Sequence, residues 1–235
     1  MGEAFQTIDA GKLSKLELAK LVQFTNVRPN ATRDMIVAHL ETCAMYQFDA
    51  AMIAMCWVPL AKEVLRGSGV KVATCFGLGF GNESLHAKIA LVRECMALGA
   101  DEIDYEPNMS LFLSGQYDQF REEGAALVRA ADGHPIKAML EFGYLKSEAE
   151  KRLGVQLLVE GEVPWIKNSS GWGEGGIAAT VEDIQLLRSV TEGTKSRAKA
   201  SGKINNYEKA VAILNAGAQM LGTSTGKNIM DTYPE

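Results

Sequence analysis

Three lysines stand near the ends of successive short apolar segments in the second half of the chain. Lys137 lies in HPIKAMLEFG, Lys167 in VPWIKNSSGWG and Lys199 in SRAKASGK. Each segment reads as a β-strand, because glycine, serine or asparagine closes a short apolar run. Burying a lysine is costly, since its ammonium loses water that the protein rarely replaces in full. Three such lysines indicate a site, and the chemistry they most readily support is Schiff-base formation with a substrate carbonyl.

Repulsion between neighbouring lysines would supply the neutral amine that this chemistry needs. Neighbouring strands lie about 4.8 Å apart, and two like charges about 5 Å apart repel by about 3 kcal/mol at an effective dielectric near 20. One of the two lysines would then have a pKa lower by about 2 units. Asp104 near the end of DEIDYEP, and Glu141 on the same strand face as Lys137, are the acidic candidates. A single strand lysine is more often an edge or snorkelling residue, so the argument depends on the joint placement of these residues.

Strand signals alternate with helix signals along the chain. The strand signals cover residues 21–26, 50–57, 70–76, 101–107, 136–142, 164–169, 196–201 and 218–224. Helical patterns between them include 32–46, 85–99, 117–131, 181–193 and 206–217. Thr180 and Asn205 are predicted helix caps, and Gly99 and Gly217 are predicted helix stops.

Eight strand–helix units predict an α/β fold, a (β/α)8 TIM barrel, which typically needs about 250 residues. We expect a single barrel domain over 21–226, an N-terminal helical extension over 1–20 and a C-terminal tail over 227–235. A doubly wound open sheet is the alternative, but its GxGxxG fingerprint is missing after the first strand. The similar GLGFG at 77–81 follows the third strand. In a barrel, catalytic groups belong at the C-terminal ends of strands, where the three lysines fall.

The composition is that of one enzyme domain. Of 235 residues, 47% are hydrophobic, and the net charge of −5 argues against nucleic acid or an anionic membrane as partner. No apolar run approaches the roughly 18 residues that span a membrane, and the N-terminus lacks the apolar core of a secretory signal. The four cysteines have no CxxC spacing, so reduced, buried thiols and a cytoplasmic location are expected. They are Cys43, Cys56, Cys75 and Cys95.

Five segments together resemble the deoxyribose-phosphate aldolase family in order and spacing, from about residue 21 to 226. They are ADEIDYEPN, IKAMLEFGYL, PWIKNSSGWGEGG, AKASGKIN and LGTSTG. The resemblance implies a class I aldolase without metal or cofactor, in which Lys167 forms the Schiff base. It implies that Lys199 favours loss of the proton from Lys167, that Asp104 is the acid/base residue, and that Lys137 and Glu141 line the site. The implied reaction cleaves 2-deoxy-D-ribose 5-phosphate to acetaldehyde and D-glyceraldehyde 3-phosphate.

Glycine- and serine-rich turns after the last three strands are candidates for holding the phosphate, because their backbone N–H groups can converge on an anion. The residues are Gly171, Gly202, Ser224 and Thr225, with Gly222 supporting the turn. The alternative is that glycine and serine merely build turns there.

Three positions bear on the choice of substrate. Lys203 stands where the family has a second glycine, so it would either pair with phosphate or block the pocket. Gln23 replaces an aspartate that the family uses in recognising a substrate hydroxyl. Tyr233 is a candidate counterpart of a tail tyrosine found in some members.

Two other functions remain open at this stage. One is a related Schiff-base aldolase that acts on a different phosphorylated or carboxylated aldol, and the other is a non-catalytic sugar-phosphate-binding barrel. His39, His86 and His134 have no metal-like spacing, which disfavours a metal-dependent aldolase. Barrels of this kind commonly form homo-oligomers, so a homo-oligomer is an expected form of this protein.

Overall fold

Eight parallel strands close into a barrel in the computed structural model, which describes residues 8–234. Each strand pairs with the next along the chain, and β1 pairs with β8. The predicted (β/α)8 barrel is therefore confirmed. The strands are β1 Val22–Asn26, β2 Ala50–Ala54, β3 Lys71–Phe76, β4 Glu102–Tyr105, β5 Ile136–Met139, β6 Trp165–Lys167, β7 Arg197–Ser201 and β8 Met220–Thr223.

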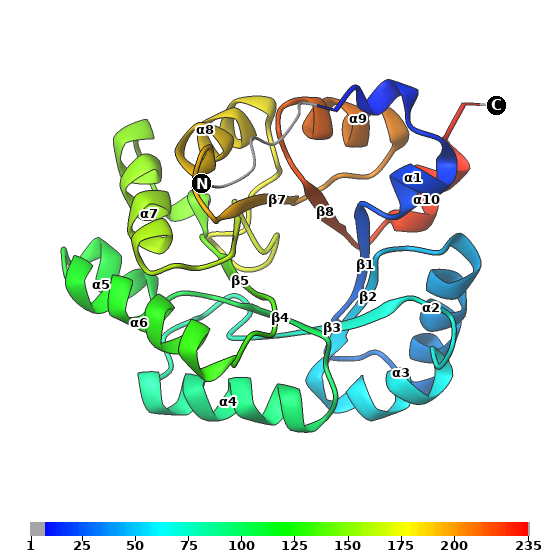
Figure 1. The fold of residues 1–235 in the computed structure, drawn as a ribbon, viewed down its shortest axis with the longest axis horizontal. Coiled ribbons are helices and arrows are strands. Elements are labelled where there is room, and N and C mark those ends of the chain that lie inside the picture. Colours follow the sequence, from blue (N-terminus) through cyan, green and yellow to red (C-terminus); the bar gives the residue numbers. More distant parts are fainter. Residues whose placement is uncertain (1–7, 235) are drawn as a thin grey trace.

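The helices form an outer ring around these strands (Figure 1). They are α1 Lys15–Ala19, α2 Arg33–Tyr46, α3 Val58–Val64, α4 Leu85–Ala97, α5 Met109–Leu113, α6 Tyr117–Ala130, α7 Glu148–Glu160, α8 Val181–Thr191, α9 Tyr207–Asn215 and α10 Gly226–Asp231. The 3-10 turns in the described part of the chain are η1 Ala10–Lys12, η2 Met55–Trp57 and η3 Phe142–Tyr144. Within residues 8–234, none of the helices is long and apolar enough to cross a membrane.

Several boundaries differ from those predicted. The strand expected over 50–57 ends at Ala54, because the chain turns into η2 and then α3, where Pro59 favours a helix start. The strand expected over 136–142 ends at Met139, ahead of η3. The described part of the predicted N-terminal helical extension contains two separate elements, η1 and α1, and residues 1–7 lie outside the described part.

The predicted helix ends are mostly confirmed. The Thr180 side chain accepts a hydrogen bond from the Asp183 backbone and caps α8, as expected. The predicted cap Asn205 is wrong by one residue, since the Asn206 side chain caps α9. Gly99 and Gly217 follow α4 and α9 with φ of 96° and 114°, a left-handed conformation in which glycine is unstrained.

Most of the apolar core lies between the strands and the helices, whereas the barrel interior is largely polar. Strand residues such as Ile53 and Ile103 belong to this large core together with helix residues such as Leu158 of α7. Inside the barrel, a small apolar cluster is formed by Ala50, Met52 and Ala73. The remaining interior is therefore free to hold charged side chains.

One buried ion pair lies outside the barrel. Lys88 of α4 is fully buried and lies 2.9 Å from Glu123 of α6. The same ammonium donates a hydrogen bond of 2.9 Å to the Glu106 carbonyl after β4. A paired and hydrogen-bonded lysine can be buried, but loss of one partner would leave an uncompensated charge.

Candidate active site

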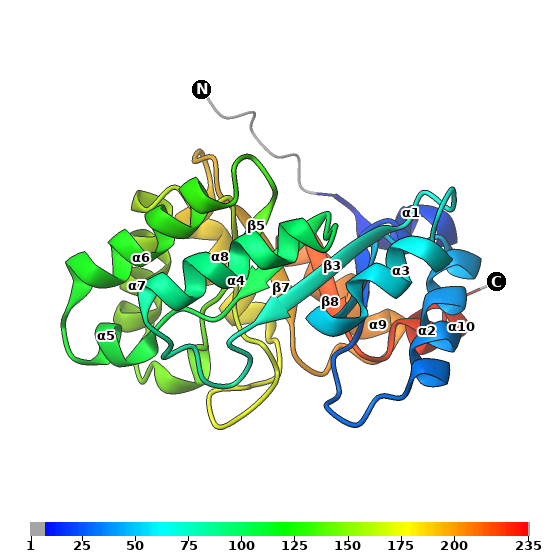
Figure 2. The same ribbon diagram turned by 90° about the horizontal axis from the view of Figure 1, so that it is seen from below.

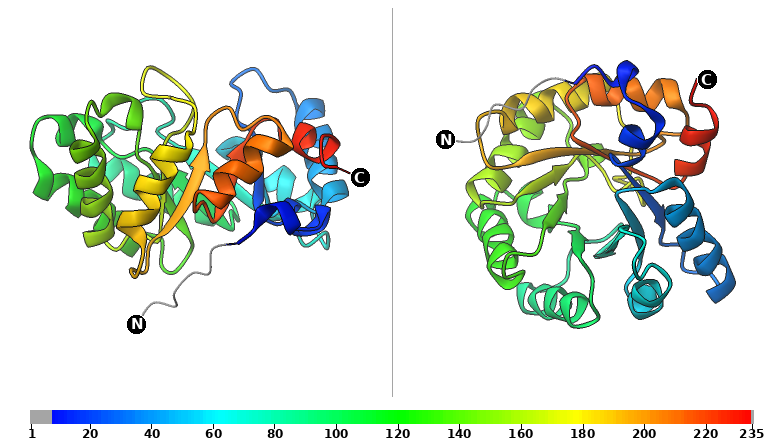
Figure 3. Two further views of the ribbon diagram at one scale, coloured as in Figure 1. Left: turned by 90° about the horizontal axis from the view of Figure 1, so that it is seen from above. Right: turned by 45° about the vertical axis from the view of Figure 1, so that its right-hand side comes forward.

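A cavity of about 340 Å³ opens at the C-terminal ends of the strands. The loops after β1, β3 and β6 gather at this end, which is lowermost in Figure 2 and uppermost in the left panel of Figure 3. Ligand sites of barrels occupy this face. Residues selected from the sequence that line the cavity are Asp104, Lys167, Gly171, Gly202, Lys203, Gly222, Ser224 and Thr225.

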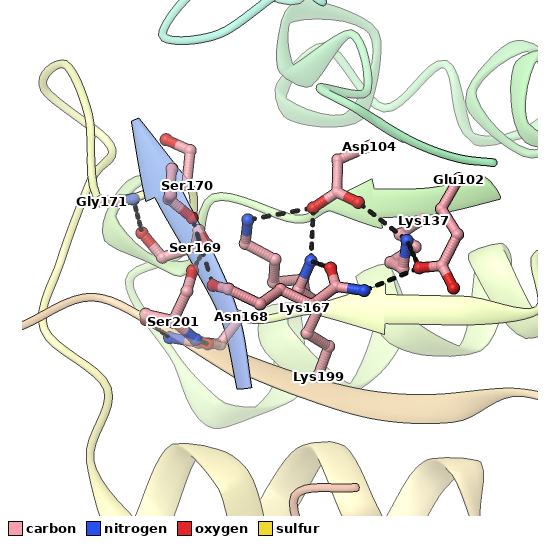
Figure 4. A network of polar contacts seen from close by, with 12 residues as sticks. Glu102, Asp104, Lys137, Lys167, Asn168, Ser169, Ser170, Gly171, Lys199 and Ser201 are labelled. Carbon is pink, nitrogen blue, oxygen red and sulfur yellow. Dashed lines mark hydrogen bonds and ion pairs between the residues drawn. The ribbon is translucent and has the colours of Figure 1, made fainter. Parts of the chain in front are cut away.

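Asp104 lies between the three lysines (Figure 4). Its Oδ2 is 2.7 Å from Lys199 Nζ and 3.3 Å from Lys167 Nζ, and its Oδ1 is 3.2 Å from Lys137 Nζ. The strand register explains the grouping, because Asp104 is opposite Lys137 and Lys167 is opposite Lys199 on neighbouring strands. Residues that lie opposite each other point to the same side of a sheet, here into the barrel.

The charges around Asp104 change the protonation of two groups. Burial lowers the pKa of Lys199 to about 7, helped by the positive charges of Lys167 and Lys137 and opposed by Asp104. Burial alone would raise the pKa of Asp104, but Lys199, Lys137 and Lys167 hold it well below its usual range. Near neutral pH, the site therefore combines an ionised carboxylate with a lysine that readily gives up its proton.

Lys137 and Gln23 lie behind the cavity and do not line it. Both are fully buried. Lys137 Nζ pairs with Glu102 Oε2 at 2.7 Å as well as with Asp104. Gln23 contacts Lys199, Asp49 and Glu102. The close polar contacts of these two side chains are with other charged groups of the barrel, and their contact with substrate stays a prediction.

Glu141 supports the loop after β6 and does not line the cavity either. It accepts hydrogen bonds from the Ser169 hydroxyl, at 3.0 Å, and from the Ser170 backbone N–H. Burial raises the pKa of Glu141, an effect that these hydrogen bonds and the charge of Lys167 oppose. The carboxylate fixes where the chain goes immediately after Lys167.

Two residues that the sequence analysis did not single out fix the same loop. Asn168 donates to the Ser201 carbonyl at 3.1 Å and accepts from the Ser201 backbone N–H at 2.9 Å, which joins the ends of β6 and β7. The Ser169 hydroxyl accepts from the backbone N–H groups of Gly171 and Ile177. Their position directly after Lys167 could have marked them as site residues. The sequence of a turn, however, does not reveal which groups its polar side chains bind.

The turn after β7 has a backbone that favours glycine. Gly202 has φ of 107°, and a Cβ there would come within 2.1 Å of the Ile177 carbonyl oxygen. Lys203 follows with φ of 50°, which lies in the left-handed region that residues other than glycine rarely adopt. Lys203 lines the cavity together with Ser224 and Thr225. The lysine therefore occupies a conformation suited to glycine and brings a cation to this wall.

Part of the wall is apolar and was not predicted. Val27, Met52, Leu78 and Trp172 contribute to it. The two glycine-containing loops that carry Leu78 and Trp172 approach closely, since a Cβ on Gly173 would lie 3.3 Å from the Gly79 backbone.

Glu106 holds the loop after β3. Its Oε2 accepts the Gly79 N–H at 2.5 Å. Burial, together with the negative charge of Glu141, raises the pKa of Glu106 to about 8. Its proton is therefore lost near the alkaline end of the physiological range.

Two expectations about other residues need correction. Cys56 is exposed and Cys75 is half-buried and lines the cavity, so only Cys43 and Cys95 are buried as expected. Tyr233 packs against Tyr207 and donates a hydrogen bond to the Leu13 carbonyl at 2.9 Å, away from the cavity. Within residues 8–234, no three His, Cys, Asp or Glu side chains are grouped so that they could hold a metal ion.

No family model matches the chain. Individual relatives and solved structures, however, are similar to it over most of its length. A deoxyribose-phosphate aldolase from Caldanaerobacter subterraneus subsp. tengcongensis is 37% identical, over 94% of this chain and 95% of the relative. One from Thermococcus gammatolerans is 35% identical, over 92% and 96%. The tetrameric structure of deoxyribose phosphate aldolase from Aeropyrum pernix superposes with a TM-score of 0.87, covering 95% of each chain at 23% identity.

Proposed function

We propose a Schiff-base mechanism for this chain, which belongs to the deoxyribose-phosphate aldolase family and is an aldehyde-lyase. The reaction is the reversible cleavage of 2-deoxy-D-ribose 5-phosphate to acetaldehyde and D-glyceraldehyde 3-phosphate. The observation that carries the proposal is the contact of Lys167 and Lys199 with one oxygen of Asp104 beside the cavity.

Lys167 is the nucleophile in this mechanism, since it is the one of the three lysines around Asp104 that lines the cavity. Its neutral amine adds to the C1 aldehyde, and loss of water gives an iminium ion. Lys199 accepts the proton that Lys167 must lose, because its own pKa is close to 7. Asp104, which contacts both lysines, passes protons between them and the carbinolamine oxygen.

Cleavage then uses the iminium as an electron sink. The C2–C3 bond breaks, its electron pair forms an enamine on Lys167, and the C3 hydroxyl gives its proton to the Asp104–Lys199 pair. Glyceraldehyde 3-phosphate leaves with the new C3 aldehyde. Protonation of the enamine carbon restores an iminium, and water hydrolyses it to acetaldehyde and free Lys167.

The phosphate of the substrate is assigned to the wall formed by the turns after β6, β7 and β8. Backbone N–H groups of glycine-rich turns are suited to an anion, and Lys203 adds a positive charge. A charge-assisted hydrogen bond to phosphate contributes about 1.5–3 kcal/mol. The residues are Gly171, Gly202, Lys203, Ser224 and Thr225, with Gly222 beneath them.

Borohydride reduction in the presence of acetaldehyde, followed by peptide mass mapping, tests the nucleophile. An ethyl adduct on Lys167 is expected, with none in Lys167→Met. Lys195→Met, which changes a lysine whose side chain is 90% exposed, is the matched control and should label normally. An unmodified Lys167 in the unaltered protein would refute the Schiff-base mechanism and favour a binding-only barrel.

Two assays address the acceptor and the assembly. Acceptor aldehydes with and without phosphate should differ in kcat/KM in favour of the phosphorylated one, whereas equal values would favour a different aldol. Self-association is proposed from the tetrameric Aeropyrum pernix structure, and light scattering on the purified protein would test it.

A further inference from the structure

Gln23 is a neutral side chain among charged ones. It lies on β1 and is fully buried. Its amide nitrogen donates to Asp49 Oδ2 at 2.8 Å and to Glu102 Oε2 at 2.7 Å. Its amide oxygen accepts from Lys199 Nζ at 2.6 Å. All hydrogen bonds of its side chain to described residues are thus to ionisable groups.

The partners fix the orientation of the amide. Asp49 and Glu102 are carboxylates that can only accept, so the NH2 group must face them, and the carbonyl oxygen must face Lys199. That oxygen can accept a hydrogen bond from either form of the lysine, since a neutral amine still carries N–H groups. The contact holds Lys199 in place without requiring it to be charged.

Three lysines of the barrel interior share two carboxylates as their ion-pair partners among the described residues. Lys137, Lys167 and Lys199 are opposed by Glu102 and Asp104. Although burial acts against ionisation, Lys137 and Lys71 lower the pKa of Glu102 to about 2. Both carboxylates are therefore ionised near pH 7, and one of the three lysines lacks a counter-charge.

The ion pairs farther from the cavity do not remove this excess of positive charge. Lys71, at the other end of β3, pairs with Asp49 at 2.8 Å and with Glu102 at 2.5 Å. Lys71 and Asp49 together therefore add one charge of each sign to this group of ion pairs. Despite burial, the carboxylates raise the pKa of both Lys71 and Lys137, so these two lysines retain their protons.

We propose that Gln23 is a positioning residue that holds Lys199 in the catalytic site without supplying a second carboxylate, so that repulsion among the three lysines is not cancelled and one of them can give up its proton. The inference rests on the proposed function, in which Lys199 receives the proton of Lys167. The ionisable groups that face Lys199 are Asp104 from β4, Lys137 from β5, Lys167 from β6 and Cys75 from β3. Burial raises the pKa of the Cys75 thiol to about 12, so it adds no charge.

Replacing the amide by a carboxylate tests the proposal. In Gln23→Glu, the added negative charge should keep Lys199 protonated and move the acidic limb of the pH profile of kcat/KM upward by about 1 pH unit or more. Gln23→Asp, which introduces the aspartate that the family has at this position, should shift the acidic limb in the same direction. Gln23→Met removes the hydrogen bonds without adding charge, so kcat should fall while the limb stays at or below its original pH.

The thermal unfolding midpoint of each variant establishes that it is folded. The proposal is overturned if folded Gln23→Glu and Gln23→Asp keep the original acidic limb, or if all three variants lose the same activity at every pH. The acetaldehyde adduct of the unaltered protein separates the two hypotheses. Without that adduct the proposed mechanism fails, whereas an adduct combined with unshifted limbs refutes only the role of Gln23.

Discussion

Lys167 and Lys199 contact the same oxygen of Asp104, at 3.3 and 2.7 Å, and lie opposite each other on β6 and β7. The lysine nearer to Asp104 is the one whose pKa falls to about 7. Of these two lysines, Lys167 is the one that lines the cavity. Nucleophile and proton acceptor are thus two different lysines joined by one carboxylate.

Lys199→Arg should retain the charge and lose the activity. A guanidinium does not give up its proton in a protein, so it cannot receive one from Lys167. We expect kcat/KM to fall about 10²- to 10⁴-fold, the usual contribution of general acid–base catalysis. Steady-state kinetics from pH 6 to 9 check this, with Lys195→Arg as the exposed control. Lys199→Met should show a similar fall in kcat/KM. A folded Lys199→Arg with near-normal activity would contradict the role of Lys199 as proton acceptor.

Lys203→Gly separates backbone strain from phosphate recognition. Glycine adopts the positive φ freely, so the free energy of unfolding should stay within about 1 kcal/mol of the original. The value of kcat/KM for 2-deoxyribose 5-phosphate should fall about 10- to 100-fold, whereas that for unphosphorylated 2-deoxyribose should not change. Lys203→Arg, which keeps a cation, should retain most of the activity. Equal losses on both substrates would argue against a phosphate contact.

Glu106→Gln should make stability less sensitive to alkaline pH. The folded state raises the pKa of Glu106 from 4.5 to about 8, so folding favours the protonated form. The contribution of Glu106 to the free energy of unfolding is therefore fully present below pH 4.5 and is lost as the pH rises through 8. Between pH 6 and 9, the unaltered protein should lose on the order of 2 kcal/mol relative to Glu106→Gln, since one pKa unit is about 1.4 kcal/mol. Urea denaturation at both pH values measures the difference, and parallel pH dependence would refute it.

Lys88→Met should destabilise the contact between α4 and α6. Removing the buried ammonium leaves the Glu123 carboxylate unpaired, at a cost of about 3–5 kcal/mol. The double variant Lys88→Met/Glu123→Leu should recover much of this loss, because neither buried charge then remains. Chemical denaturation of the single and double variants tests the prediction. Failure of the second change to restore any stability would show that packing, and not charge, is the cause.

The sequence predicted the grouping of the site well where strand periodicity controls it. The positions of Asp104, Lys137, Lys167 and Lys199 follow from a period of two residues and from the order of neighbouring strands. The contacts of Gln23 could not be predicted in this way. They depend on side-chain length and on the register between β1 and the rest of the barrel, with Lys199 lying 176 residues away.

Loop residues were harder to interpret because their partners are set by tertiary contacts. Ser169 and Gly171 looked alike as turn residues, yet Ser169 binds Glu141 and backbone N–H groups whereas Gly171 lines the cavity. The apolar wall formed by Leu78 and Trp172 depends on the approach of two loops that are about 90 residues apart. Neither propensity nor local pattern contains that information.

The distance along the chain between Gln23 and Lys199 has a consequence for folding. β1 meets β8 only when the barrel closes, and until then the interior ammonium groups need water. A half-barrel of β4 to β7 would carry Lys137, Lys167 and Lys199 but would be open on one side. Excluding water from its interior would incur a large desolvation free energy for these ammonium groups. Closure and dehydration should therefore be one event, and refolding chains should recover turnover only when the first and last strands have paired.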